Sequence, residues 1–159
     1  MNLLIVSQNT NPNYLKDLQT NLQEQGHTVH LPYYVYDKNR ILEVPGITAG
    51  NKTILSSSKL KEIVNKNQQE YYQQLLQQKG EDQLDAVLLY NPDPESFRIT
   101  QEVQLPLLYA LKEQMPIITY QKSQAMYYMA GSLDINPESI YCIHGNLDLL
   151  NPKQKVKRK

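Results

Sequence analysis

Residues 3–31 constrain the fold more than any other part of the sequence. A short continuous apolar run at 3–6 is typical of a strand buried on both faces. In the polar stretch after it, Asn11 can cap a helix whose first residue is Pro12, and leucines then recur at helical spacing until Gly26. Residues 28–31 predict a second strand. Because two strands joined through a helix in one sheet pair in parallel, this unit predicts an α/β fold.

The rest of the chain continues this alternation. The clearest element is DAVLLY at 85–90, a buried central strand that an Asn-Pro-Asp-Pro turn ends. Helices are predicted over 59–78, from Thr100 to about residue 114 and around 123–130, and strands over 116–120 and 139–143. Pro106 requires either a kink in the second of these helices or a helix start nearer Leu105.

These elements predict one domain. We expect a single-domain, flavodoxin- or Rossmann-like three-layer α/β sandwich over residues 1–150, with a mostly parallel five-stranded sheet. Residues 33–58 lack a clear period and are expected to form an excursion over the edge or mouth of the sheet. Residues 151–159 are basic, nearly free of apolar groups, and are expected to be a flexible tail.

Charge and cysteine content argue against several classes of protein. Lys+Arg and Asp+Glu both total 16, so there is no net field to attract a polyanion, and neither nucleic-acid nor membrane binding is expected. Cys142 is the single cysteine, and His27 and His30 would point to opposite faces of a strand, so neither a disulfide nor a metal site is expected. With no signal-peptide pattern and no cofactor motif, we expect a cytoplasmic protein that binds no cofactor.

Polar segments follow three of the predicted strands, at 7–13, 91–100 and 120–124. In an open parallel sheet, ligands collect beyond the carboxyl ends of the strands. No GxGxxG or GxxxxGK[ST] motif occurs, so side chains would have to contact the ligand. Asp93 and Glu95 could accept hydroxyl groups of a sugar or act as acid and base. The candidate binding residues are Ser7, Asn9, Asn11 and Asn91.

Tyrosine is unusually frequent, with 12 tyrosines against one phenylalanine and no tryptophan. Tyr33 stands where the second strand opens into the excursion, and its ring is a candidate to stack on a base. The alternative is that the tyrosines form contacts between subunits of a homo-oligomer, because their amphipathic side chains suit an interface.

Several segments together resemble the nucleoside 2-deoxyribosyltransferase-like superfamily, and specifically its small divergent bacterial and phage members. They are MNLLIVSQNTNPNYLKDLQTNLQEQGHTVHLP, DQLDAVLLYNPDP, LPLLYALKEQMPIITY and IHGNLDLL. The resemblance implies a flavodoxin-like sheet with a nucleoside or nucleotide bound over the strand ends. It also implies cleavage or transfer of an N-glycosidic bond by a glutamate nucleophile.

The resemblance also implies where the nucleophile should be. Alignment on Tyr109 and its neighbours puts Gln104 at the nucleophile position, and a neutral amide cannot form the covalent ester of this chemistry. Glu102, two residues away, and Asp93 are the carboxylates that could replace it, with Gln104 as a substrate contact.

Other functions stay open. A non-catalytic ligand-binding domain, a receiver-like domain and an oligomeric scaffold are all compatible with this sheet. The receiver alternative has Ser7 and Gln8 where magnesium-binding aspartates would stand.

Overall fold

The computed structural model describes residues 1–8, 11–33, 35, 57–136 and 139–150, and for 57–61 and 101–102 it describes the backbone alone. The strands are β1 (Asn2–Val6), β2 (Thr28–His30), β3 (Ala86–Leu89), β4 (Ile117–Thr119) and β5 (Tyr141–Cys142). The helices are α1 (Pro12–Glu24), α3 (Ser57–Gln77), α4 (Gln101–Lys112) and α5 (Gln124–Ser132), with 3₁₀ turns at Gly80–Asp82 and Leu147–Leu149. The predicted basic tail at 151–159 and most of the predicted excursion lie outside the described residues.

The strands form one five-stranded sheet in the order β2-β1-β3-β4-β5, and every neighbouring pair is parallel. This order is the flavodoxin-like one, so the predicted α/β class is confirmed. The strand bounds differ from the predicted ones by at most two residues at either end, as is usual at element ends.

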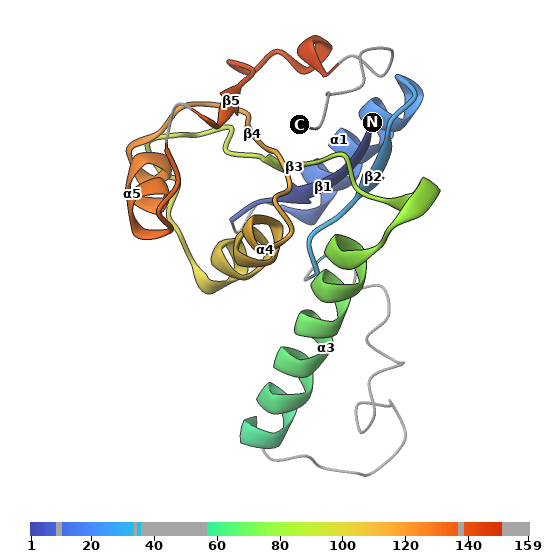
Figure 1. Cartoon of the computed structure of the whole chain (residues 1–159), viewed down its shortest axis with the longest axis vertical. Helices are drawn as coiled ribbons and strands as arrows, with labels where there is room; N and C mark the ends of the chain where they lie inside the picture. The colour runs from blue at the N-terminus through green and yellow to red at the C-terminus, as the bar shows by residue number, and fades with distance from the viewer. Residues whose placement is uncertain (9–10, 34, 36–56, 137–138, 151–159) are drawn as a thin grey trace.

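Helices cover both faces of the sheet (Figure 1). On one face α1 packs three buried leucines against Leu3, Ile5 and Leu88. On the other face α3, α4 and α5 pack against Leu4, Val87 and their neighbours. Figure 1 shows α3 extending well beyond the sheet, so its carboxyl-terminal half makes the main core contacts. The α1 leucines, Leu15, Leu18 and Leu22, are each at most 6% exposed.

The helix ends follow from local sequence in two cases. Asn11 is the N-cap of α1 and accepts a hydrogen bond from the backbone N–H of Asn13 at 2.9 Å, with Pro12 as the first helical residue. Ser123 is the N-cap of α5, and its hydroxyl accepts from the N–H of Met126 at 3.1 Å. The amino termini of α1 and α5 therefore follow β1 and β4.

Pro106 lies inside α4 rather than at its start. Val103, Leu107 and Ala110 of this helix are fully buried in the core. Their burial offsets the cost of about 3 kcal/mol that proline imposes in a helix interior. Among the described residues, no helix has the length and apolar character needed to span a bilayer.

Candidate functional site

The turns after β1 and β3 open at the same edge of the sheet because the strands run in parallel. The Ser7 hydroxyl donates to the carbonyl of Tyr90 at 3.1 Å, and the side-chain oxygen of Gln8 accepts from the backbone N–H of Arg98. Two polar turns that are far apart in the sequence are thus joined directly. This edge contains the point where the strand order reverses, between β1 and β3, which is the usual ligand position in such folds.

Asn91 fixes the turn after β3 to the turn after β4. Its side-chain NH₂ donates to the carbonyl of Gln121 at 2.7 Å, and its side-chain oxygen accepts from the N–H of Gln121 at 2.8 Å. The Thr119 hydroxyl donates to the same carbonyl at 2.8 Å. Asn91 is 2% exposed, so its amide holds the turns of this edge together.

A pair of aromatic rings closes the α1 side of the same edge. Tyr90 follows β3 and Tyr120 follows β4, and their ring centroids are 4.9 Å apart in an edge-to-face arrangement. Burial, and then the neighbouring Tyr120, raise the pKa of the Tyr90 hydroxyl. Gly145 packs against this region, because a Cβ there would lie 2.8 Å from the side-chain nitrogen of Gln121.

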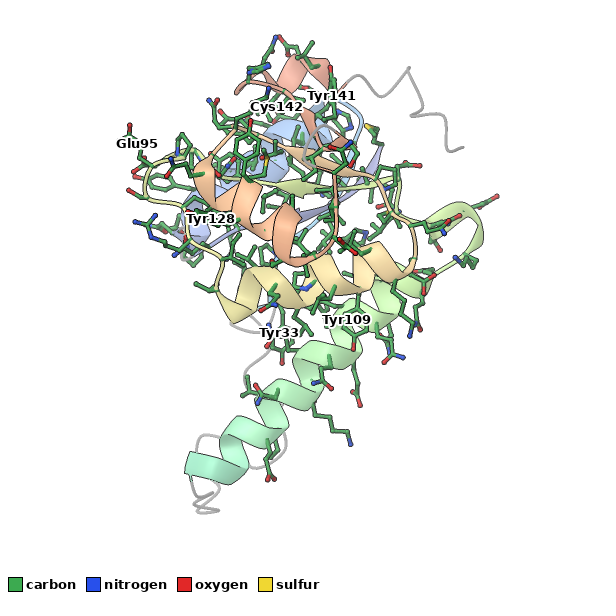
Figure 2. All side chains as sticks on the ribbon, turned by 60° about the vertical axis from the view of Figure 1, so that its left-hand side comes forward. Tyr33, Glu95, Tyr109, Tyr128, Tyr141 and Cys142 are labelled. Carbon is green, nitrogen blue, oxygen red and sulfur yellow. The ribbon has the colours of Figure 1, made fainter. Side chains whose placement is uncertain are left out.

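A cavity of about 710 Å³ lies on the other side of this edge, between the connection from β3 to α4 and the start of α5. This size is in the range of small-molecule sites. One wall is formed by Glu95, Arg98 and two neighbours in 94–98, and the other by Lys122, Tyr128 and three neighbours in 122–125. Figure 2 shows Glu95 and Tyr128 on the same side of the molecule.

Two cations and a helix amino terminus face this cavity. One guanidinium nitrogen of Arg98 donates to the carbonyls of Glu95 at 3.1 Å and Phe97 at 2.9 Å, which orients the group. Within the described part of the chain, neither Arg98 nor Lys122 forms an ion pair with a carboxylate. Ser123 caps α5, so the first N–H groups of this helix add partial positive charge. The cavity therefore suits an anion.

Tyr128 gives the cavity a flat apolar rim. It is 78% exposed, the largest value among the exposed large hydrophobic side chains in the described residues. It is also one of the residues that line the cavity. A ring in that position can stack on a planar group of a ligand.

The sequence-predicted binding residues are only partly brought together. Ser7 and Asn91 lie at the carboxyl edge but are buried and hydrogen-bonded within the protein. Asn11 is exposed and caps α1. Asn9 lies outside the described residues. Tyr33 is 5% exposed and packs in the core with its ring centroid 5.6 Å from that of Tyr71, and Figure 2 shows it far from Glu95.

The predicted catalytic residues are also dispersed. Asp93 is exposed, and its carboxylate accepts from the Ser96 hydroxyl at 2.6 Å, which closes the turn after β3 rather than lining the cavity. Gln104 lies in a separate hollow between α3 and α4, beside Gln68 and Leu108. Glu102 is in the first turn of α4, and its side chain lies outside the description.

The residues that sequence reasoning missed are Arg98, Lys122 and Tyr128. A signal for two of them was present, because Arg98 and Lys122 lie in the polar segments after β3 and β4. Lys122 also precedes Ser123, a residue type that starts helices. Cys142 is buried, and its sulfur lies 3.6 Å from Nδ1 of His144, outside the cavity lining. No group of three metal-binding side chains occurs among the described residues.

Comparisons with known proteins bear on the fold. No family model matches the chain, and no curated protein matches it. It is similar to a crystal structure of a conserved protein from Enterococcus faecalis V583, with a TM-score of 0.51 and 11% sequence identity over 98% of this chain and 99% of that chain. At this identity the likeness shows a shared fold alone.

Proposed function

We propose that this domain binds a nucleotide, a ligand with an anionic group and a planar base, in the cavity between the β3–α4 connection and α5. One observation carries the proposal: Arg98, Lys122 and the amino terminus of α5 converge on a cavity of about 710 Å³ at the carboxyl edge of a parallel sheet. That edge is where folds of this kind bind nucleotides.

The anionic group is the part of the ligand for which support is strongest. Hydrogen bonds to charged groups contribute about 1.5–3 kcal/mol each, and α5 adds its dipole. A phosphate held there would contact both cations at once. The Arg98 guanidinium is already oriented by its hydrogen bonds to two carbonyls. Lys122 directly precedes Ser123, the capping residue of α5.

The rest of the lining supports a sugar and a base as the remainder of the ligand. The exposed ring of Tyr128 offers a stacking surface, and the Glu95 carboxylate can accept hydrogen bonds from sugar hydroxyls. These features fit a nucleoside monophosphate better than inorganic phosphate alone.

The proposal is for binding without cleavage of the glycosidic bond. That chemistry needs a carboxylate beneath the anomeric carbon and an acid for the departing base. Glu95 is the carboxylate among the lining residues, Asp93 is bonded to Ser96, and Gln104 belongs to another hollow. We therefore expect a nucleotide to be bound and released unchanged.

Calorimetric titration with a nucleoside monophosphate, the matching nucleoside and inorganic phosphate tests this function. The monophosphate should bind most tightly and the nucleoside most weakly. A dissociation constant of 1 mM corresponds to a binding free energy of about −4 kcal/mol. If the monophosphate does not bind at millimolar concentration, the proposal is refuted.

Chromatography of the same mixtures for free base tests the absence of cleavage. We expect no base. Base release that is lost in Glu102→Gln but kept in Gln104→Ala would instead assign a deoxyribosyltransferase-like activity with Glu102 as nucleophile.

A further inference from the structure

β2 is an outer strand of the sheet, and within the part of the chain that the structure describes one of its sides has no strand partner. On its inner side, the Thr28 N–H donates to the carbonyl of Met1 at 2.9 Å, in register with β1. Backbone groups of alternate residues in a strand point to opposite sides, so those of Val29 and Leu31 point away from β1. Such an open edge is a template on which another chain can add a strand.

Both outward carbonyls are already bound by side chains. The Gln19 side-chain NH₂, from α1, donates to the carbonyl of Val29 at 2.8 Å. The Tyr71 hydroxyl, from α3, donates to the carbonyl of Leu31 at 2.5 Å. The two helices pack on opposite faces of the sheet, so the edge is closed from both sides.

A hollow of about 440 Å³ lies beside this edge, and the polar groups of Gln19, His30, Tyr71 and Gln78 in its lining are hydrogen-bonded within the protein. Besides Gln19 and Tyr71, Nε2 of His30 lies 3.1 Å from the side-chain oxygen of Asn2. Gln78 donates to the carboxylate of Asp82 at 3.4 Å. These commitments argue against a ligand site and in favour of a structure that protects the strand.

We propose that Gln19 and Tyr71 seal the free edge of β2 and so prevent a second copy of the chain from adding its own β2. Two such strands would be self-complementary. If they paired antiparallel about His30, Val29 of one copy would face Leu31 of the other, with hydrogen bonds to the same carbonyls that Gln19 and Tyr71 occupy. The seal and the pairing are therefore mutually exclusive.

The Tyr71 hydroxyl keeps its proton over the whole physiological range. Burial, and secondarily Tyr72, raise the pKa of this phenol well above its ordinary value. Its donation to Leu31 is consequently independent of pH near neutrality.

Sedimentation of the double variant Gln19→Ala/Tyr71→Phe over a concentration series tests the seal. We expect it to dimerise at a concentration at least about tenfold lower than the wild-type chain, as loss of about 1.4 kcal/mol of competing contacts would give. A matched control is Gln74→Ala/Tyr14→Phe, because Gln74 lines the same hollow and Tyr14 is 65% exposed. The control should behave like the wild type.

Amide hydrogen exchange identifies the surface. In the double variant, the N–H groups of Val29 and Leu31 should become protected as concentration rises, and addition of Val29→Pro should abolish the dimer. Val29→Pro removes an outward N–H without removing a bond to β1. If the double variant does not fold, Tyr71→Phe alone removes one hydroxyl, and the same exchange measurement applies.

Three results would overturn the proposal. One is a folded double variant that associates no more than the wild type. Another is a dimer that survives Val29→Pro. The third is concentration-dependent protection of Val29 and Leu31 in the wild-type chain, which would mean that the edge already pairs.

Discussion

Two hollows of this domain differ in what their polar groups do. In the carboxyl-edge cavity, neither Lys122 nor Arg98 has a carboxylate partner within the described residues. In the hollow beside β2, Gln19, Tyr71 and His30 are hydrogen-bonded to backbone or neighbouring side chains. The two cations of the first hollow have no carboxylate partner among the described residues, whereas these three polar groups of the second hollow already have hydrogen-bond partners.

This difference teaches that a hollow becomes a candidate site through uncommitted groups rather than through its volume. A buried polar group that already has its partner gains little from a ligand, because binding would exchange one hydrogen bond for another. An unpaired cation beside a helix amino terminus gains both charge and hydrogen bonds. Substitutions at either hollow test this difference.

The largest expected effect comes from removing both cations. Arg98→Ala/Lys122→Ala should weaken binding of a nucleoside monophosphate about 100-fold or more, since two charge-assisted contacts of about 1.5–3 kcal/mol are lost. Calorimetry measures the change, and Lys66→Ala/Lys112→Ala, on exposed faces of α3 and α4, is the control. Equal losses in both variants would mean that general charge, and not the cavity, binds the ligand.

Asn91→Ala tests whether Asn91 stabilises the fold at the carboxyl edge or contacts the ligand. Because this amide joins two turns and Asn91 is buried, its loss should lower the free energy of unfolding by about 1–3 kcal/mol. Urea denaturation gives the value, with the exposed Asn65→Ala as reference. Unchanged stability together with lost ligand binding would instead make Asn91 a ligand contact, as the sequence alone suggested.

Tyr128→Ala tests the planar part of the ligand. We expect about fivefold weaker binding of the nucleoside monophosphate, from about 1 kcal/mol of stacking, and unchanged binding of inorganic phosphate. Tyr14→Ala, another exposed tyrosine, should change neither affinity. A loss for phosphate as well would show that Tyr128 shapes the cavity rather than stacking on a base.

The smallest effect concerns His30, beside the hollow at β2. Burial lowers the pKa of this histidine, with Asp82 acting in the opposite direction but less strongly. The unfolded chain then binds more protons than the folded one, so the free energy of unfolding falls as the pH drops through about 6.5 toward the lowered folded-state pKa. Denaturation at pH 7.5, 6.5 and 5.5 should show a smaller fall in His30→Gln, and identical slopes would contradict this.

Much of the fold could be predicted from the sequence because its signals are local. The Asn11-Pro12 start of α1, its spaced leucines and the apolar DAVLLY run each specify an element within a few residues. The sequence left open whether α4 runs from Thr100 through Pro106 or starts nearer Leu105. Its path depends on burial of Val103 and Leu107 against partners distant in the sequence.

The site could be predicted less well, because the hydrogen-bond partners of a side chain often come from distant parts of the sequence. Asn91 is bonded to Gln121, 30 residues away, and Ser7 to Tyr90, 83 residues away. Tyr33 is held in the core by α3, because the Tyr72 hydroxyl of this helix accepts a hydrogen bond from the backbone N–H of Tyr33. The sequence placed its candidate residues at the carboxyl edge of the sheet, where folds of this kind bind ligands, but it did not indicate which polar residues there already have partners.

Amide chemical-shift mapping during titration with a nucleoside monophosphate is the most direct test of the central claim, that the ligand binds between the β3–α4 connection and α5. We predict that shifts concentrate at residues 94–98 and 122–128, while Val29, Leu31 and Gln74 stay unchanged. Shifts centred on the hollow beside β2, or none at either place, would contradict it.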